Sequence, residues 1–266
     1  AISDGRLEAN STFHRKRQRW QQQALLRADY LLPVSSTLLP HLDANSEDRV
    51  QAFVTPCVVS LPDTETSAEH DRAVARERLA LGDRPTILYR GGASAWQQPR
   101  LIVEVFKCVQ REMPNAILLL IPASVDEFQS IIAEAGVSTD DVRVASVPHN
   151  EVSRLGCAAD MGLLIREDTI VNRVASPTKF GEYLQMGVPV LITDSLPDFC
   201  EIVNKEGVGE VVHAAATPPE LAKSALLLLQ RRMDGKSLRA RCRQVAKKWL
   251  SFDSILPQYR AIYAGN

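Results

Sequence analysis

Short apolar segments alternate with amphipathic segments from residue 86 to residue 212. The apolar segments are typical of strands that are buried on both faces of a sheet. We expect six such strands, at residues 86–89, 116–121, 142–145, 161–165, 188–192 and 209–212. The segments between them predict helices, because their apolar residues recur at helical spacing. The chain therefore predicts an α/β fold with a doubly wound parallel sheet, whose ligands bind beyond the carboxyl ends of the strands.

The composition argues against several classes of partner. Lysine and arginine total 31 and aspartate and glutamate total 32, so no broad positive field attracts nucleic acid. The apolar runs are far shorter than the roughly 20 residues that cross a bilayer as a helix. The cysteines are far apart and form no C-x-x-C pair: Cys57, Cys108, Cys157, Cys200 and Cys242. We therefore expect no nucleic-acid partner, no tetrahedral metal site and a cytoplasmic location.

Basic residues gather in two places. Residues 14–19 read His-Arg-Lys-Arg-Gln-Arg, and residues 236–248, within a predicted C-terminal helix, contain six lysines and arginines. We expect both sets to lie on solvated helix faces. Peripheral contact with the inner face of a membrane is the competing interpretation.

The segment that begins at Ser176 places a cation at the start of a helix. Ser176 is suited to cap a helix whose first helical residue is Pro177, and Gly187 is suited to end it. Lys179 then falls in the first turn, where the helix dipole disfavours a cation unless an anion lies nearby. We expect that anion to be a phosphate, bound by Lys179 and by the backbone amides of residues 178–180.

Glu182 provides a second polar group on the same helix. It follows Lys179 by three residues and Thr178 by four, so the three side chains share one face. A cation beside helix amides suits a diphosphate, whereas a carboxylate suits the paired hydroxyls of a sugar. Together they predict a nucleotide-sugar site. An exposed ion pair between Lys179 and Glu182 explains the same spacing without any ligand.

Three segments resemble one family. Residues 176–190 read Ser-Pro-Thr-Lys-Phe-Gly-Glu-Tyr-Leu-Gln-Met-Gly-Val-Pro-Val and resemble the S-P-x-K-x-x-E-Y-L-x-x-G-x-P-V signature of glycosyltransferase family 4, in its nucleotide-sugar-binding domain. Residues 148–152 and 158–164 are similar to the base-binding loop and the following strand of that domain, and residues 91–97 resemble its glycine loop. The resemblance extends from about Arg27 to the C-terminus.

The resemblance implies a GT-B fold and a division of the chain. Residues 61–250 would form the Rossmann-like nucleotide-sugar-binding domain, and residues 251–266 the C-terminal crossover helix. Residues 1–60 resemble the end of the N-terminal acceptor domain with its linker, a partial segment of a second Rossmann-like domain. We predict four elements there, too few for an independent core, at residues 10–28, 30–34, 35–42 and 50–55. The rest of that domain, or another subunit, is therefore an expected partner.

The resemblance also implies the activity. A retaining glycosyltransferase of polysaccharide biosynthesis would take a UDP- or GDP-linked sugar as donor, without cofactor or metal, and a glycan, lipid-linked or small-molecule acceptor. Lys179 and Arg166 are the catalytic candidates that stabilise the departing diphosphate, and Glu182 is the candidate that holds the ribose hydroxyls. Further donor-binding candidates are Gly91, Gly92, Trp96, His149, Asn172, Ser176, Pro177 and Thr178.

Two departures from the family pattern leave alternatives open. Val174 occupies the place of the first glutamate of an E-x7-E pattern, and Gly92 and Trp96 lie near the places of two phosphate-binding cations. Lys179 and Arg166 are expected to substitute for those cations, although an ion pair of Arg166 with a neighbouring carboxylate accounts for it equally well. A non-catalytic nucleotide-sugar-binding or interaction module is one alternative function. An epimerase or phosphorylase of the same fold is another.

Overall fold

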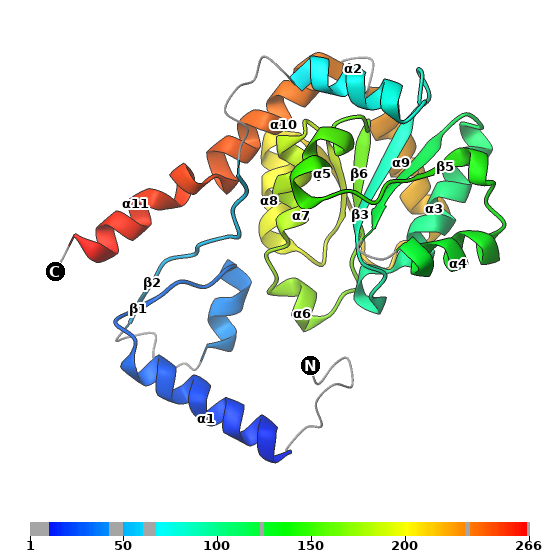
Figure 1. Ribbon diagram of the computed structural model, residues 1–266. Helices are drawn as coiled ribbons and strands as arrows, with labels where there is room; N and C mark the ends of the chain where they lie inside the picture. The colour runs from blue at the N-terminus through cyan, green and yellow to red at the C-terminus, as the bar shows by residue number, and fades with distance from the viewer. Residues whose placement is uncertain (1–10, 43–49, 61–67, 123–124, 232–234, 265–266) are drawn as a thin grey trace.

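The computed structural model describes residues 11–42, 50–60, 68–122, 125–231 and 235–264. Its largest element is a six-stranded parallel sheet with the strand order β5-β4-β3-β6-β7-β8 (Figure 1). The order reverses between β3 and β6, as it does in the doubly wound Rossmann fold. The expected α/β fold with a doubly wound parallel sheet is therefore confirmed.

All six expected strands are present, each within two residues of its expected bounds. They are β3 (Thr86–Gly91), β4 (Ile117–Pro122), β5 (Val142–Val144), β6 (Met161–Leu164), β7 (Val190–Thr193) and β8 (Gly209–Val212). In β4 every residue from Ile117 to Ile121 is buried. A strand that helices cover on both faces needs apolar side chains in both directions, so its apolar run is continuous.

Helices cover both faces of the sheet (Figure 1). One face carries α3 (Pro99–Glu112), α4 (Val125–Ala135) and α9 (Pro218–Gln230). The other face carries α2 (Ala68–Arg78), α5 (His149–Gly156), α7 (Thr178–Gln185), α8 (Pro197–Glu206) and α10 (Gly235–Leu250). Successive residues of a strand point to opposite faces. Tyr89 therefore packs against Phe128 of α4, whereas Arg90 reaches Glu182 of α7.

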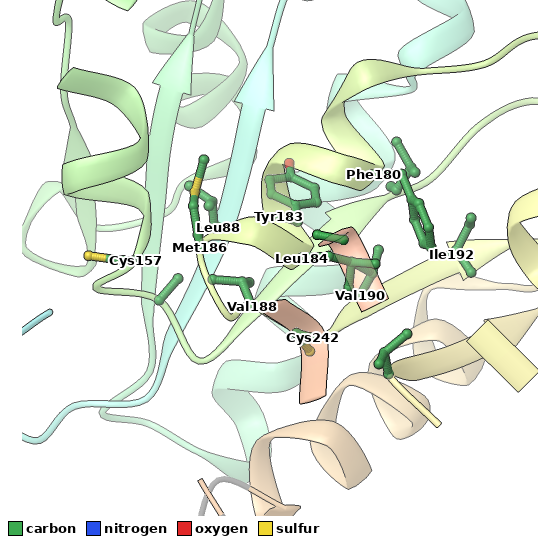
Figure 2. Packing of buried hydrophobic residues seen from close by; sticks show 14 of the residues in the cluster. Leu88, Cys157, Phe180, Tyr183, Leu184, Met186, Val188, Val190, Ile192 and Cys242 are labelled. Atoms are coloured by element: carbon green, nitrogen blue, oxygen red, sulfur yellow. The ribbon is translucent and has the colours of Figure 1, made fainter. Parts of the chain in front are cut away.

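Tyr183 of α7 fills the space where β3 and β6 separate (Figure 2). The two strands pair only as far as Leu88 and Gly162. Beyond that point the Tyr183 hydroxyl accepts the backbone N–H of Arg90 at 2.9 Å and donates to the carbonyl of Leu163 at 3.3 Å. Gly162 leaves room for the ring, because a Cβ there would lie 2.8 Å from Cδ2 of Tyr183. The tyrosine thus fixes α7 beside the point where the strand order reverses.

The N-terminal residues form a small separate unit. It contains α1 (Thr12–Arg27), β1 (Tyr30–Leu31), the 3-10 helix η1 (Ser36–His41) and β2 (Gln51–Ala52). β1 and β2 pair in parallel, apart from the six-stranded sheet. The predicted order of elements is confirmed, although the strands are shorter than expected. η1 is a 3-10 helix, and Pro40 within it cannot donate the hydrogen bond that an α-helix requires.

The C-terminal helix α11 (Phe252–Tyr263) lies beside the segment that follows β2. The N–H of Val59 donates to the carbonyl of Leu250 at 2.8 Å, and the Thr55 hydroxyl lies 3.3 Å from Oε1 of Gln258. The Ser251 hydroxyl caps the helix by accepting the N–H of Ser254. The domain boundaries at residues 60 and 250 stay predictions.

The basic run of α1 is solvated as expected, with residues 15–19 all exposed. Peripheral contact of these basic residues with a membrane stays a prediction. Among those residues, no helix is both long enough and apolar enough to span a bilayer.

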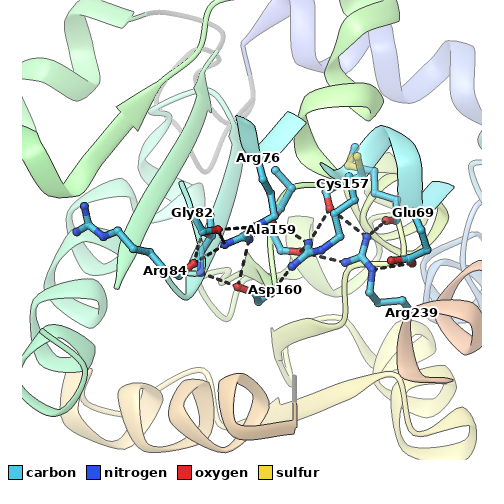
Figure 3. A network of polar contacts seen from close by, with 12 residues as sticks. Glu69, Arg76, Gly82, Arg84, Cys157, Ala159, Asp160 and Arg239 are labelled. Carbon is cyan, nitrogen blue, oxygen red and sulfur yellow. Dashed lines mark hydrogen bonds and ion pairs between the residues drawn. The ribbon is translucent and has the colours of Figure 1, made fainter. Parts of the chain in front are cut away.

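Buried arginines join α2 and α10 to the ends of α5 and α7 (Figure 3). Arg239 of α10 is only 6% exposed, so its expected place on a solvated face is wrong. Its guanidinium donates to the carbonyls of Cys157, Ala159 and Met186. The last carbonyls of a helix lack intrahelical partners, and a cation near them interacts favourably with the negative end of the helix dipole. Arg239 therefore supplies the donor for the Met186 carbonyl and shares the carbonyls of Cys157 and Ala159 with Arg72.

Arg72 of α2 extends this network. It donates to the carbonyls of Ala158 and Ala159 and pairs with Asp160 at 2.5 Å. Asp160 in turn accepts the backbone N–H of Thr86, at the start of β3, at 2.8 Å. Through Asp160, the network thus connects α2 to the amino-terminal end of β3.

We expect Arg239→Met to lower the free energy of unfolding by about 1–3 kcal/mol, because the Met186 carbonyl loses its donor and the carbonyls of Cys157 and Ala159 keep only Arg72. Arg241 lies exposed on the same helix, so Arg241→Met is expected to change stability by less than about 0.5 kcal/mol. Urea unfolding of the two variants measures the difference. Equal stability of both variants would contradict the structural role of Arg239.

Candidate functional site

Three cations converge where β3 and β6 end. Arg90 is near the end of β3, Arg166 follows β6, and Lys179 lies in the first turn of α7. Burial and the charges of Arg166 and Arg90 together lower the pKa of Lys179 to about 7, against an opposing effect of Glu182. The structure thus brings the candidates Lys179, Glu182 and Arg166 together at one end of the sheet.

Lys179 points back toward β3 and the glycine loop. Its ammonium donates to Oε1 of Gln97 and lies 5.0 Å from the centroid of the Tyr89 ring. The Tyr89 hydroxyl also lies 3.0 Å from Oε1 of Gln97 and donates to the carbonyl of Gly92 at 2.7 Å. Among the described residues the lysine has a neutral acceptor and an aromatic face as partners, and neither neutralises its charge.

Glu182 is 8% exposed and forms an ion pair with Arg90, not with Lys179. The interpretation of Lys179 and Glu182 as an exposed ion pair is therefore wrong. Helical spacing puts both side chains on one face, but α7 presents that face to β3 and not to solvent. The end of β3 supplies Arg90 to Glu182 and the glycine loop supplies Gln97 to Lys179.

Arg166 is held by its backbone while its side chain stays unpaired. The Thr193 hydroxyl accepts the N–H of Arg166 at 2.9 Å and lies 3.1 Å from its carbonyl. Asp168, one of the expected partners, pairs with Arg173 instead at 2.6 Å. Within the described part of the chain, the Arg166 guanidinium makes no hydrogen bond or ion pair. Burial lowers its pKa, with Tyr89 acting in the opposite direction.

The glycine loop wraps around the Lys179 ammonium. Gly91 has φ of 132°, a conformation that side chains rarely adopt, and a Cβ there would overlap the end of the Lys179 side chain. Gly92 has more room, because the nearest atom to its Cβ position is Nε2 of Gln97 at 3.6 Å. Trp96, in the 3-10 turn η4 (Ala95–Gln97), is half-buried, and its carbonyl accepts the N–H of Glu167 at 3.4 Å.

The start of α7 differs from the prediction in its cap. Thr178 is the first helical residue and Pro177 takes the capping position, without a side-chain hydrogen bond. The Ser176 hydroxyl instead accepts the N–H of Cys57 at 2.8 Å and does not cap α7. Within the described residues the N–H groups of Thr178 and Lys179 have no acceptor, whereas residue 180 donates to Pro177. Two of the three expected amides thus remain available.

Two other candidates take different places. His149, the first residue of α5, is exposed, and its Nδ1 lies 3.3 Å from Nη2 of Arg90, so it joins the site. Asn172 lies in the short helix α6 (Ile170–Arg173), which the sequence did not predict. Asn172 is 2% exposed, and its side-chain amide donates to the carbonyl of Glu167. The amide is therefore buried and already bonded within the protein.

The N-terminal unit holds the segment between α6 and α7. The Ser35 hydroxyl donates to the carbonyl of Val174 at 2.8 Å, and the Thr37 hydroxyl donates to that of Arg173 at 2.6 Å. The hydrogen bond between Cys57 and Ser176 is a third contact, and together the three fix the chain just before α7.

Sequence analysis missed Arg90, whose charge lies at the centre of the site. A charged residue that ends an apolar strand and directly precedes Gly91 was the available signal. In the family pattern the phosphate-binding cations follow the glycine loop, whereas Arg90 precedes it. The site thus contains three cations and the carboxylate of Glu182, and no cluster of potential metal ligands is found in the described residues.

Comparison with solved structures gives the fold a wider context. WaaG, a glycosyltransferase involved in lipopolysaccharide biosynthesis, superposes with a TM-score of 0.69 at 15% identity, covering 96% of this chain and 69% of WaaG. A mutant of TarM from S. aureus, in complex with fondaparinux, α-GlcNAc-glycerol and UDP, gives 0.68 at 10% identity over 96% of this chain and 48% of TarM. The trehalose-6-phosphate phosphatase N-terminal domain of Candida albicans gives 0.65 at 13%, covering 95% and 62%.

These likenesses establish a fold of the GT-B glycosyltransferase kind. The chain spans less than two thirds of the TarM and phosphatase-domain structures. No family model matches the sequence, and no curated protein matches it either.

We expect Gly91→Ala to destabilise the protein by about 1–3 kcal/mol, because the loop must hold a side chain at a φ of 132°. Gly92→Ala is the matched control. Its added methyl group meets only ordinary contacts, so the expected change is within about 0.5 kcal/mol. Urea unfolding distinguishes the two, and equal destabilisation would show that Gly91 is not the constrained position.

Proposed function

We propose that this chain is the donor-binding part of a retaining glycosyltransferase that takes a UDP- or GDP-linked sugar. The observation that carries the proposal is the excess of positive charge at the switch point of the sheet, where three cations face one carboxylate. Ligands of doubly wound sheets bind at this point, and an anion there would offset the cost of burying the cations.

The diphosphate would lie between Lys179, Arg166 and the free amides at the start of α7. Arg166 has no partner in the described residues, and Lys179 has only neutral ones, so both are available to an anion. When the bond between sugar and phosphate breaks, negative charge grows on the departing nucleotide. Donors that are already oriented stabilise that charge without reorganisation. Gly91 and Gly92 would let the phosphates approach the loop backbone closely.

Glu182 would bind the ribose hydroxyls, with His149 and its loop on the side of the base. The carboxylate of Glu182 accepts two hydrogen bonds, which suits adjacent hydroxyl groups. Trp96, whose carbonyl accepts the N–H of Glu167, would shelter the sugar. No protein-bound cofactor enters this proposal, because cationic side chains supply the stabilisation of the diphosphate.

The acceptor would bind against the N-terminal part of the protein. We propose a glycan, a lipid-linked or a small-molecule acceptor, a cytoplasmic location with peripheral contact at the inner membrane face, and a role in polysaccharide biosynthesis. The hydrogen bonds from Ser35 and Thr37 to the segment before α7 support a close connection between the N-terminal part and the donor site.

A non-catalytic nucleotide-sugar-binding module is the second candidate. Val174, at the place of the missing glutamate, offers only its carbonyl, and Ser35 already occupies that carbonyl. Donor hydrolysis separates the two candidates, since a catalytic protein releases free sugar from the donor slowly even without acceptor, whereas a binding module leaves the donor intact.

We expect calorimetric titration to show binding of UDP or GDP, with one preferred, and Lys179→Met to weaken that binding at least tenfold. Glu182→Gln is expected to reduce the preference for the ribonucleotide over its 2′-deoxy form, because the carboxylate is the proposed partner of the ribose. Lys248→Met, which removes a surface ion pair with Glu206, serves as the control. Failure of the unchanged protein to bind either nucleotide at millimolar concentration would contradict the proposal.

A further inference from the structure

We infer that Arg90 determines the specificity of the site for phosphorylated nucleotides, by holding Glu182 when no nucleotide is bound and exchanging it for the diphosphate when one binds. The inference rests on the proposed function and assigns a role to a residue of β3, outside α7. It makes recognition of ribose conditional on recognition of phosphate.

The first observation is that Arg90 occupies the carboxylate that the ribose would need. Its Nη1 pairs with Oε2 of Glu182, and the two side chains are only 18% and 11% exposed. A ribose hydroxyl must therefore displace the guanidinium before it gains the full carboxylate. Breaking a shielded ion pair without a replacement is costly, because it leaves both charges without a partner.

The second observation is that the Arg90 backbone is fixed while its side chain has few other partners. The backbone N–H donates to the Tyr183 hydroxyl, and the residue pairs with Ile121 in the sheet. Within the described residues, the guanidinium's other hydrogen-bonding partner is Nδ1 of His149, at 3.3 Å. Rotation of the side chain about a fixed Cα moves the charge without disturbing the strand.

The third observation concerns the charges that surround Arg90. Burial lowers the pKa of Lys179, and the charges of Arg166 and Arg90 lower it further, so the three cations lie close enough to repel one another. A diphosphate placed among the three cations brings more negative charge than one carboxylate and offers paired oxygens to a guanidinium. It is therefore a stronger partner for Arg90 than Glu182 is.

The exchange couples the two halves of the nucleotide. Once the diphosphate holds Arg90, Glu182 is a shielded carboxylate without its cation, and ribose hydroxyls satisfy it. A nucleoside that lacks phosphate gains no such release. Arg90 also supplies a phosphate-binding cation at the glycine loop, where Gly92 and Trp96 provide none.

The test compares a nucleoside with its diphosphate. Calorimetry or ligand-observed NMR measures uridine and UDP, or guanosine and GDP, against the unchanged protein and Arg90→Gln. We expect Arg90→Gln to weaken the diphosphate at least tenfold and to tighten the nucleoside at least threefold, because Glu182 is then free. Weakening of both ligands by the same factor would overturn the inference.

Two further variants keep the result interpretable. Arg231→Gln removes another arginine–glutamate pair, with Glu210 at the start of β8, and is expected to change neither affinity. Arg90→Lys keeps a cation beside Glu182 but loses the two-point contact with phosphate. It should weaken the diphosphate and leave the nucleoside within twofold, which decides the question if Arg90→Gln does not fold. If the unchanged protein binds neither diphosphate, the proposed function fails first, and the inference with it.

Discussion

The repulsion among Arg90, Arg166 and Lys179 is the constraint on which the rest of the site depends. Like charges in a partly buried site raise each other's free energy, and among the described residues Glu182 pairs with Arg90. Burial, together with the charges of Arg166 and Arg90, lowers the pKa of Lys179 to about 7. A protein that gathers cations in this way is stabilised by any anion that enters, so affinity for an anion follows from the arrangement itself.

The fold keeps the three cations together by fixing the backbone of Arg90, the backbone of Arg166 and the helix that carries Lys179. Tyr183 holds the Arg90 N–H, and the Thr193 hydroxyl holds that of Arg166. α7, which carries Lys179, is held at its other end by Arg239 through the carbonyl of Met186. Arg239, at one end of α7, thus helps to position Lys179 at the other end.

Sequence patterns predicted the parts of this arrangement that depend on local chemistry. The six apolar runs predicted the strands because burial on both faces requires continuous apolar residues, and the spacing of Lys179 and Glu182 correctly placed them on one helix face. The partners of those residues depend on which strand lies opposite, and periodicity carries no such information. Arg90 was therefore missed.

Two other predictions failed for similar reasons. Ser176 has the right chemistry for a helix cap, but its hydroxyl bonds to Cys57, which is far away in sequence. Arg239 lies in a helix rich in basic residues and was expected in solvent, yet the carbonyls of two other helices require it in the interior. In each case a tertiary contact outweighed the local preference, and only the assembled fold reveals that contact.

The most direct test of the charge account is the titration of Lys179 itself. NMR of the protein with ¹³C-dimethylated lysines, assigned with Lys179→Met, would follow that one ammonium as the pH changes. We predict a pKa of about 7 in the free protein and a clear rise when UDP or pyrophosphate is added, because the anion stabilises the charged form. An ordinary lysine pKa in the free protein, unchanged by either ligand, would contradict the account.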